Sequence, residues 1–259
     1  GVFRFRTLDD TRGMIRYARA HERAVVIGGG LLGLEAARGL QNHGVAVPVV
    51  HAAGHLMNQQ LDAAGGAILR RAVQNLGIAV EVDARATAVV GEHRVEGVQL
   101  ADGRVLPCDM VVVAAGIRPN TALGTSSGLL VERGIVVDDQ LRCLDDDGSP
   151  EPGIFAVGEC VQHRDQVYGL VAPLWEQARV LADVVTGANP HAAYHGSRVA
   201  TKLKVAGVDV ASMGVTAPER DTDDHVVVRE PRRGVYKSVV VRDDRLIGAT
   251  LVGDLDKVG

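Results

Sequence analysis

The chain has 259 residues, a length that fits one or two domains. Its 28 Lys and Arg residues against 32 Asp and Glu residues give a formal net charge of −4, which excludes the broad basic surface that proteins use to bind nucleic acid or an anionic membrane. A hydrophobic content of 46% excludes wholesale disorder, and an aromatic content of 3% argues against a stacking platform for nucleobases.

In the first half of the chain, strand patterns alternate with helical ones. They predict a helix over 8–20, a buried strand over 23–27, a helix that ends at 42–44, a strand over 45–50 that contains Pro48, a helix over 62–76 and a strand over 78–82. From Ala86 to Pro107 the hydrophobic pattern changes to a period of two residues, which is typical of strands. It favours a hairpin with strands over 95–100 and 104–107 and a turn at Asp102 and Gly103. A buried strand is predicted to follow over 110–115. This alternation indicates an α/β, Rossmann-like fold.

The second half of the chain contains more strands. Residues 121–134, rich in Gly, Ser and Thr, are predicted to cross between two domains. Short strands are expected over 135–137 and 154–157, with an acidic loop over 145–150 between them, and a helix over 173–186 is opened by Pro173 and closed by Gly187. Strands are predicted over 226–229, 235–241 and 246–252, with a turn at Asp243 and Asp244.

The cysteines and the longest uncharged stretch narrow the class of protein further. Cys108, Cys143 and Cys160 lie far apart and form no CxxC pair and no zinc or iron–sulfur spacing, so we assign no metal site and predict a reducing, cytoplasmic location. Residues 39–61 carry no formal charge, but their His, Asn and Gln content is too polar for a spanning helix. We therefore expect neither a membrane nor a nucleic acid as a partner.

The segment Gly28-x-Gly30-x-x-Gly33 closes an apolar strand and opens a helix, which is the setting of a dinucleotide-binding fingerprint. Gly28 allows a tight turn, Gly30 lets the backbone approach a pyrophosphate, and Gly33 lets the helix pack closely on the strand. The N–H groups at the start of the helix, around Leu31 and Leu32, can hold the phosphate charge. We predict that these five residues bind NAD(P).

The fingerprint normally places an acidic residue at the end of the second strand, where its carboxylate binds the ribose 2′-hydroxyl. The residue at that place in this chain is His51. A neutral imidazole does not repel a 2′-phosphate and a protonated one attracts it, so we expect NADH and NADPH to differ in affinity by less than about tenfold. The alternative is that His51 is a surface histidine without a role in binding.

Two further strand-to-turn elements follow, one ending at Ala115 and Gly116 and the other at Gly158 and Glu159. With the Gly-rich unit, they resemble the FAD/NAD(P) pyridine nucleotide oxidoreductases. The resemblance implies that the first element belongs to the nicotinamide domain and that the second binds the ribityl–phosphate part of FAD through its acid, which is Glu159 here and more often Asp. The chain has no redox CxxxxC pair, unlike the disulfide reductases of that family.

A closer resemblance is to the flavoprotein part of the assimilatory NAD(P)H nitrite reductase large subunit. It rests on the segments Val49–His51, His55–Met57, Gln60–Asp62, Val157–Cys160, Val167–Pro173 and Thr201–Val210. The resemblance implies NAD(P)H and FAD as cofactors, hydride transfer between them, and electron delivery to a sirohaem/iron–sulfur module or a small carrier, with nitrite as final acceptor. It further implies an NAD(P)-binding domain over 1–121, part of an FAD-binding domain over 122–195, an interface-type segment over 196–259 and a possible homodimer.

The resemblance also implies roles for side chains near the flavin. Glu35 would lie near the nicotinamide, and the helix over 173–186 would direct its N-terminus, with Pro173, Leu174 and Trp175, toward the flavin ring. The alternatives are a solvated Glu35, a Trp175 that packs in the core and a Cys160 that is a small buried side chain without a redox role. We assign no catalytic acid or base, because the chemistry belongs to the cofactors.

Two parts of the resembling proteins have no counterpart in this sequence: a first Gly-rich unit for the ADP part of FAD and a cysteine-rich sirohaem region. The first residue is Gly and not Met, so the chain is expected to be truncated at both ends and to retain FAD poorly. Two alternatives stay open: a rubredoxin- or ferredoxin-reductase-like diaphorase, and a non-catalytic NAD(P)-binding fragment. Bound yellow FAD would favour an enzyme over the binding fragment.

Overall fold

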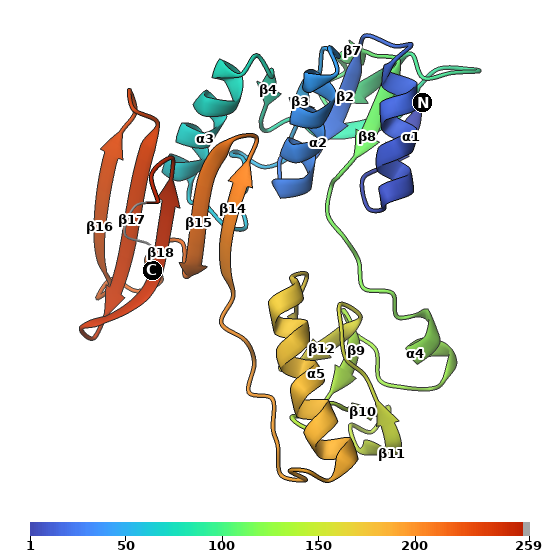
Figure 1. Cartoon of the computed structure of the whole chain (residues 1–259), viewed down its shortest axis with the longest axis vertical. Coiled ribbons are helices and arrows are strands. Elements are labelled where there is room, and N and C mark those ends of the chain that lie inside the picture. Colours follow the sequence, from blue (N-terminus) through green and yellow to red (C-terminus); the bar gives the residue numbers. More distant parts are fainter. Residues whose placement is uncertain (256–259) are drawn as a thin grey trace. The chain divides into compact units, whose positions relative to one another are not determined.

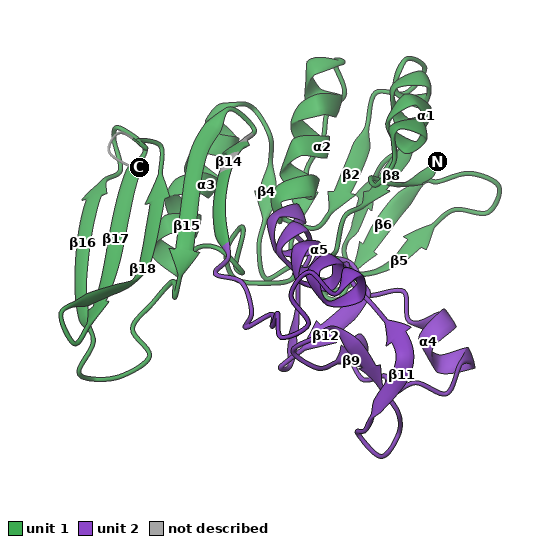
Figure 2. Cartoon of the chain, turned by 60° about the horizontal axis from the view of Figure 1, so that its bottom comes forward, with its two compact units in different colours: residues 1–116, 200–259 green, residues 117–199 purple. Residues whose placement is uncertain are grey.

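The computed structural model describes residues 1–255, and its contacts divide the chain into two compact units (Figure 2). Residues 1–116 together with residues 200 onward form unit 1, and residues 117–199 form unit 2. This grouping differs from the three segments expected over 1–121, 122–195 and 196–259, because the last sheet shares a buried cluster with the first helices and strands. What each predicted segment binds stays a prediction.

A parallel sheet forms the centre of unit 1 (Figure 1). Its strands are β1 Val2–Arg4, β2 Ala24–Ile27, β3 Val49–Val50, β4 Val80–Glu81 and β8 Met110–Val113. They lie in the order β1, β8, β2, β3, β4, and Val26 lies between Val112 on β8 and Val49 on β3. The first strand of this order, β1, was not expected from the sequence.

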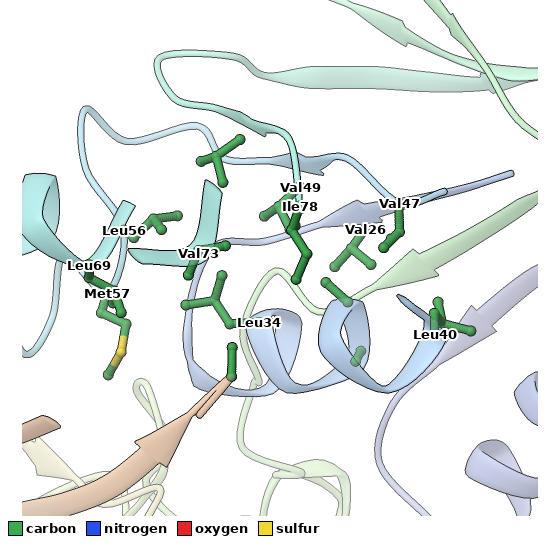
Figure 3. Close-up of a cluster of buried hydrophobic side chains, with 14 of the residues drawn as sticks. Val26, Leu34, Leu40, Val47, Val49, Leu56, Met57, Leu69, Val73 and Ile78 are labelled. Carbon is green, nitrogen blue, oxygen red and sulfur yellow. The ribbon is translucent and has the colours of Figure 1, made fainter. Parts of the chain in front are cut away.

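Both faces of this sheet are buried, which explains the unbroken apolar runs of its strands. One face contributes Val26, Val49 and Val112 to a cluster with helices α1 Leu8–Ala18, α2 Leu31–Asn42 and α3 Ala63–Asn75. Figure 3 shows Leu34 and Leu40 of α2 and Val73 of α3 within this cluster. The opposite face contributes Val25, Val50 and Val111 to a second cluster.

The second cluster is covered by an antiparallel sheet of strands β5 Ala86–Val90, β6 Gly97–Leu100 and β7 Val105–Pro107. The predicted hairpin at Asp102 and Gly103 is confirmed: Gly103 has a φ of +88°, and the Asp102 carboxylate accepts from the Arg104 N–H at 3.0 Å. Because these turn signals act between neighbouring residues, the sequence alone could locate the hairpin.

Two strands of the parallel sheet are shorter than the sequence predicted. The strand expected over 45–50 is reduced to β3, because Pro48 has no N–H and interrupts the ladder, although Ala46 forms an isolated bridge with Arg23. The Pro48 carbonyl still accepts from the Val26 N–H at 3.0 Å. The strand expected over 78–82 is reduced to β4, whose two residues pair with β3.

Unit 2 contains one sheet and one long helix. Its elements are α4 Ala122–Ser126, β9 Ile135–Val137, β10 Arg142–Leu144, β11 Pro150–Phe155, β12 Val161–His163, β13 Gln166–Val167 and α5 Val171–Thr186. The strands lie in the order β11, β10, β9, β12, β13, and α5 ends as predicted at Gly187, whose φ is +73°. No helix among residues 1–255 is long and apolar enough to span a bilayer.

Two predictions for this unit were wrong. Residues 121–134 do not merely cross between domains, because they form α4 and two isolated bridges inside unit 2. The strand expected over 154–157 begins instead at Pro150. The Asp145 carboxylate accepts from the N–H groups of Asp147 and Ser149 at 3.0 and 2.8 Å, and this turn returns the chain antiparallel to β10.

Residues 200–252 form an antiparallel sheet in unit 1 (Figure 1). Its strands are β14 Ala200–Val205, β15 Val208–Gly214, β16 Asp224–Glu230, β17 Val235–Arg242 and β18 Arg245–Val252, in the order β14, β15, β18, β17, β16. The predicted turn at Asp243 and Asp244 is confirmed by their φ values of +49° and +57°. Val210, Tyr236 and Val252 bury their side chains in the cluster that also contains α2 and α3.

Candidate functional site

The Gly-rich loop between β2 and α2 has three glycines with three different constraints. Gly28 has a φ of +122°, and a Cβ there would lie 2.2 Å from the Ala114 carbonyl oxygen. A Cβ on Gly33 would lie 1.9 Å from the Gly28 carbonyl oxygen, whereas one on Gly30 would meet nothing within 4 Å. The loop is therefore tight at Gly28 and Gly33 and open at Gly30, the place where the fingerprint brings a pyrophosphate close to the backbone.

The start of α2 differs from the starts of the two helices beside it. Thr7 and Asp10 form a capping box at α1, and the Asp62 carboxylate accepts from the Gly65 N–H at 2.7 Å at the start of α3. At α2 the N-cap is Gly30, which offers no side chain, and the first turn contains no acid. The first N–H groups of α2 thus keep their capacity for an external anion such as a pyrophosphate.

His51 directly follows β3 and contacts the Gly-rich loop. The Gly29 N–H donates to its Nδ1 at 3.1 Å, and its Nε2 lies 3.2 Å from Oδ1 of Asn58. Burial lowers the pKa of the imidazole, which favours the neutral form. His51 is therefore a half-buried neutral side chain bound to the loop and not a free surface histidine; its contact with a ribose stays a prediction.

We expect an NMR titration to give His51 a pKa below the ordinary 6.5, because the charged form loses hydration on burial. Since the unfolded chain then binds a proton more readily, His51 destabilises the fold only as the pH falls below about 6.5. The imidazole signal of His51 is assigned as the one that is missing from the spectrum of a His51→Gln variant. An imidazole signal of His51 that titrates above 6.5 would contradict the burial argument.

The remaining predicted residues of unit 1 lie around the same end of the sheet. Leu31 packs against the buried cluster, whereas Leu32 is exposed. Glu35 lies on the exposed side of α2, and partial desolvation of its carboxyl raises its pKa. Ala115 follows β8 next to Gly28, and Gly116 has a φ of +108° that favours glycine. The structure thus brings the fingerprint, His51 and the turn after β8 together.

Unit 2 holds the second set of predicted residues. The Gly158 N–H donates to Oε1 of Gln177 at 3.0 Å, which joins the turn after β11 to the second turn of α5. Gln177 is fully buried, and its Nε2 has no hydrogen-bond partner among the described residues. Gly158 has a φ of +112° with open space around its Cβ position, and Glu159 beside it is half-buried. Such a turn is open to the polar chain of a flavin cofactor.

The start of α5 is a second helix end without a side-chain cap. Its N-cap is Leu170, and its first turn contains no acid. Pro173 is buried and Leu174 packs against the unit 2 core, but Trp175 is 65% exposed. The alternative that Trp175 is a core residue is therefore wrong. An uncapped helix start beside the Gly158 turn fits a negatively charged or electron-rich group.

Comparison with known proteins decides the family. Residues 1–180 match the pyridine nucleotide-disulphide oxidoreductase family, which is more than half of the chain. The chain belongs to this family. Residues 200–258 also match a second family model, the rubredoxin NAD+ reductase C-terminal domain. The sheet formed by β14 to β18 is therefore similar to that domain.

Several relatives are similar over nearly all of the chain. A nitrite reductase [NAD(P)H] from Bacillus subtilis (strain 168) is 44% identical over 98% of the chain, and the nitrite reductase (NADH) large subunit of Escherichia coli (strain K12) is 36% identical over 99%. The chain covers only 31% and 30% of these proteins. It therefore spans about a third of the length of the curated relatives it matches.

Solved structures of the family have the same fold. A ferredoxin reductase for the CYP199A2 system from Rhodopseudomonas palustris matches with a TM-score of 0.83 and 28% identity, over 97% of the chain and 61% of that protein. An NAD-dependent persulfide reductase from A. fulgidus matches with a TM-score of 0.84 and 26% identity, over 98% of the chain and 50% of that protein. The predicted α/β, Rossmann-like fold with a β-rich C-terminal segment is confirmed by these likenesses and by the family match.

The cysteines of this family member differ in exposure. Burial raises the pKa of the Cys108 and Cys143 thiols, whereas Cys160 is half-buried and not fully buried as expected. We expect iodoacetamide at about pH 8 to modify Cys160 at least tenfold faster than the other two, because alkylation needs an accessible thiolate. Peptide mapping after a time course measures the rates, and equal labelling of all three in denaturant is the control. Faster modification of Cys108 or Cys143 would contradict it.

Two contacts near the candidate sites were not predicted from the sequence: that of Asn58 with His51 and that of Gln177 with the Gly158 turn. Asn58 contacts His51 from a polar segment, Asn58-Gln59-Gln60, that carries no helical or strand period. Gln177 reaches the Gly158 turn from α5 across 19 residues of sequence. Neither contact leaves a signal in the local pattern, because both depend on how distant segments pack.

Proposed function

We propose that the chain binds NAD(P)H in unit 1 and the flavin part of FAD in unit 2, and that it carries electrons from NAD(P)H to an external acceptor. The observation that supports this most is the Gly-rich loop that is open at Gly30 and leads into the uncapped start of α2. Membership in the pyridine nucleotide-disulphide oxidoreductase family supports a nicotinamide dinucleotide as the occupant.

In this proposal the residues of unit 1 bind and orient NAD(P)H. The N–H groups after Gly30 hold the pyrophosphate, and Gly116 after β8 leaves room for the nicotinamide half. The Glu35 carboxyl, with a pKa raised by desolvation, is an acceptor for the nicotinamide carboxamide N–H. None of these groups has to move a proton during the reaction.

In unit 2 the residues hold and polarise the flavin. Glu159 accepts hydrogen bonds from the ribityl chain next to Gly158, and the buried Gln177 amide fixes the turn that presents both. The positive end of α5, with Pro173 and Leu174 in its first turn and Trp175 directly after them, would favour electron density on the ring. When FAD is bound, it supplies hydride acceptance and the release of single electrons.

The final acceptor is proposed to be nitrite, reached through a sirohaem/iron–sulfur module. The names of the Bacillus and Escherichia relatives support it, as does a Bacillus subtilis assimilatory nitrate reductase electron transfer subunit that is 39% identical over 98% of the chain. A small carrier is the second candidate, supported by the ferredoxin reductase structure and by the rubredoxin NAD+ reductase domain match. The spacing of the cysteines supports a cytoplasmic location; the homodimer stays a prediction.

Two titrations separate the proposed sites. We expect Glu159→Ala to weaken the binding of added FAD by at least about tenfold while the Kd for NADH changes less than twofold, because the two cofactors use separate groups. Glu151→Ala, which removes a half-buried carboxylate of β11, is the matched control. Unchanged FAD binding by Glu159→Ala would contradict the role of this turn, and a chain that binds neither cofactor would contradict the proposed function.

A further inference from the structure

A chain of hydrogen bonds leads from the Gly-rich loop to an exposed amide. The backbone N–H of Gly29 is a donor, so His51 Nδ1, at 3.1 Å, must accept. A neutral imidazole then carries its proton on Nε2, which donates to Oδ1 of Asn58 at 3.2 Å. The tautomer of His51 is thus set by the loop and not by solvent.

The position of Asn58 is also fixed by the loop. The Met57 N–H donates to the Gly29 carbonyl oxygen at 2.9 Å, and Leu56 and Met57 are fully buried. Gly29 therefore binds His51 through its N–H and Met57 through its carbonyl oxygen. Asn58 itself is exposed, and through its contact with His51, the residue after β3, it lies near the Gly-rich loop.

The orientation of the Asn58 amide follows from these bonds. Its Oδ1 is occupied by the His51 Nε2–H, so its Nδ2, with two N–H donors, is the polar group left for a ligand. Two neutral donors can bind either a hydroxyl or a phosphate oxygen. A carboxylate at the same place would repel a phosphate.

We propose that Asn58 is a specificity-determining residue, whose Nδ2 donates to the 2′ group of the adenosine ribose and lets the site accept NADPH as well as NADH. This inference rests on the proposed function and deepens it. His51 acts as a positioning residue, since both of its ring nitrogens are bound to protein groups. The competing candidate is Asp83, whose carboxylate lies 3.3 Å from the Cβ position of Gly54 at the same sheet edge.

The test is an isosteric charge change. Asn58→Asp keeps an oxygen for the His51 Nε2–H and replaces the two donors by a carboxylate oxygen. The Kd values for NADPH and NADH are measured by titration of the purified chain at about pH 8, where the imidazole is neutral. We expect Asn58→Asp to weaken NADPH at least tenfold more than NADH, and Gln59→Glu, the matched exposed control, to change the ratio less than about threefold.

The proposal is overturned if Asn58→Asp leaves the ratio of the NADPH and NADH Kd values unchanged. It is also overturned if Gln59→Glu changes this ratio as much as Asn58→Asp does, or if Asp83→Asn changes it more. A nitrogen–proton NMR correlation that shows the His51 proton on Nδ1 would also overturn it. The proposed function fails separately, since a chain that binds neither dinucleotide contradicts the nucleotide site itself. Binding of both dinucleotides with an unresponsive ratio contradicts the role of Asn58 alone.

Discussion

Replacing Gly30 by Val is expected to weaken NADH binding by at least about 100-fold, or ~2.7 kcal/mol, without unfolding the chain. A Cβ at Gly30 meets nothing within 4 Å, and its φ of −83° and ψ of −176° suit any residue, so the free protein accommodates the side chain. The added methyl groups then occupy the space where a pyrophosphate has to approach the first N–H groups of α2. Calorimetric titration with NADH measures the loss.

The same helix offers matched controls. Gly39 also has no atom within 4 Å of its Cβ position, so Gly39→Val makes the same chemical change away from the loop and should leave the Kd within about twofold. Gly33→Val should instead destabilise the fold, because its Cβ would lie 1.9 Å from the Gly28 carbonyl oxygen. NADH binding by Gly30→Val as tight as that of the parent would mean that the dinucleotide binds elsewhere.

The features that the sequence predicted well are those decided by neighbouring residues. The left-handed Gly187 at the end of α5, the turn at Asp102 and Gly103 and the start of α3 at Asp62 each depend on a backbone preference or a bond within a few residues. The wrong boundaries depend on pairing. β11 begins at Pro150 because the Asp145 turn reverses the chain onto β10, and an isolated apolar run cannot show where its partner lies.

The residues of the candidate site show the same difference between features set by neighbouring residues and features set by distant contacts. Gly28, Gly30 and Gly33 were predicted because the three constraints act within one strand–turn–helix unit. His51 was predicted by position, yet its neutral state depends on burial and on two groups, Gly29 and Asn58, that reach it through the fold. The state of His51, on which the proposed specificity of this site depends, therefore follows from contacts that a periodic pattern does not encode.

Replacing Tyr236 by Ala is expected to lower the free energy of unfolding by about 3–5 kcal/mol, the range for deleting a large buried aromatic side chain. Tyr236 is fully buried in the main cluster of unit 1, its ring lies 3.0 Å from the Cβ position of Gly65 on α3, and its hydroxyl donates to the Asp62 carboxylate that caps this helix. The side chain thus connects the last sheet to the helix beside the candidate dinucleotide site. Urea denaturation followed by circular dichroism measures the loss.

Tyr236→Phe separates packing from the hydrogen bond. It should cost about 1.5–3 kcal/mol, the range for a hydrogen bond to a charged group, whereas Tyr17→Phe removes only a 3.3 Å bond to the Asp109 carbonyl and should cost less than about 1.5 kcal/mol. Burial, with the Asp62 carboxylate, raises the pKa of Tyr236 to about 12 from its ordinary 10.0.

Because the pKa of Tyr236 is raised in the folded protein, its contribution to the free energy of unfolding depends on pH. Because the unfolded tyrosine loses its proton first, the parent protein should lose stability as the pH rises above about 10, and Tyr236→Phe should lose less over the same interval. This difference distinguishes the Tyr236–Asp62 bond from a general effect of alkali on the fold, which would act on both proteins alike. A Tyr236→Phe variant as stable as the parent at neutral pH, with the same decline above pH 10, would mean that α3 and the last sheet are held together by apolar packing alone.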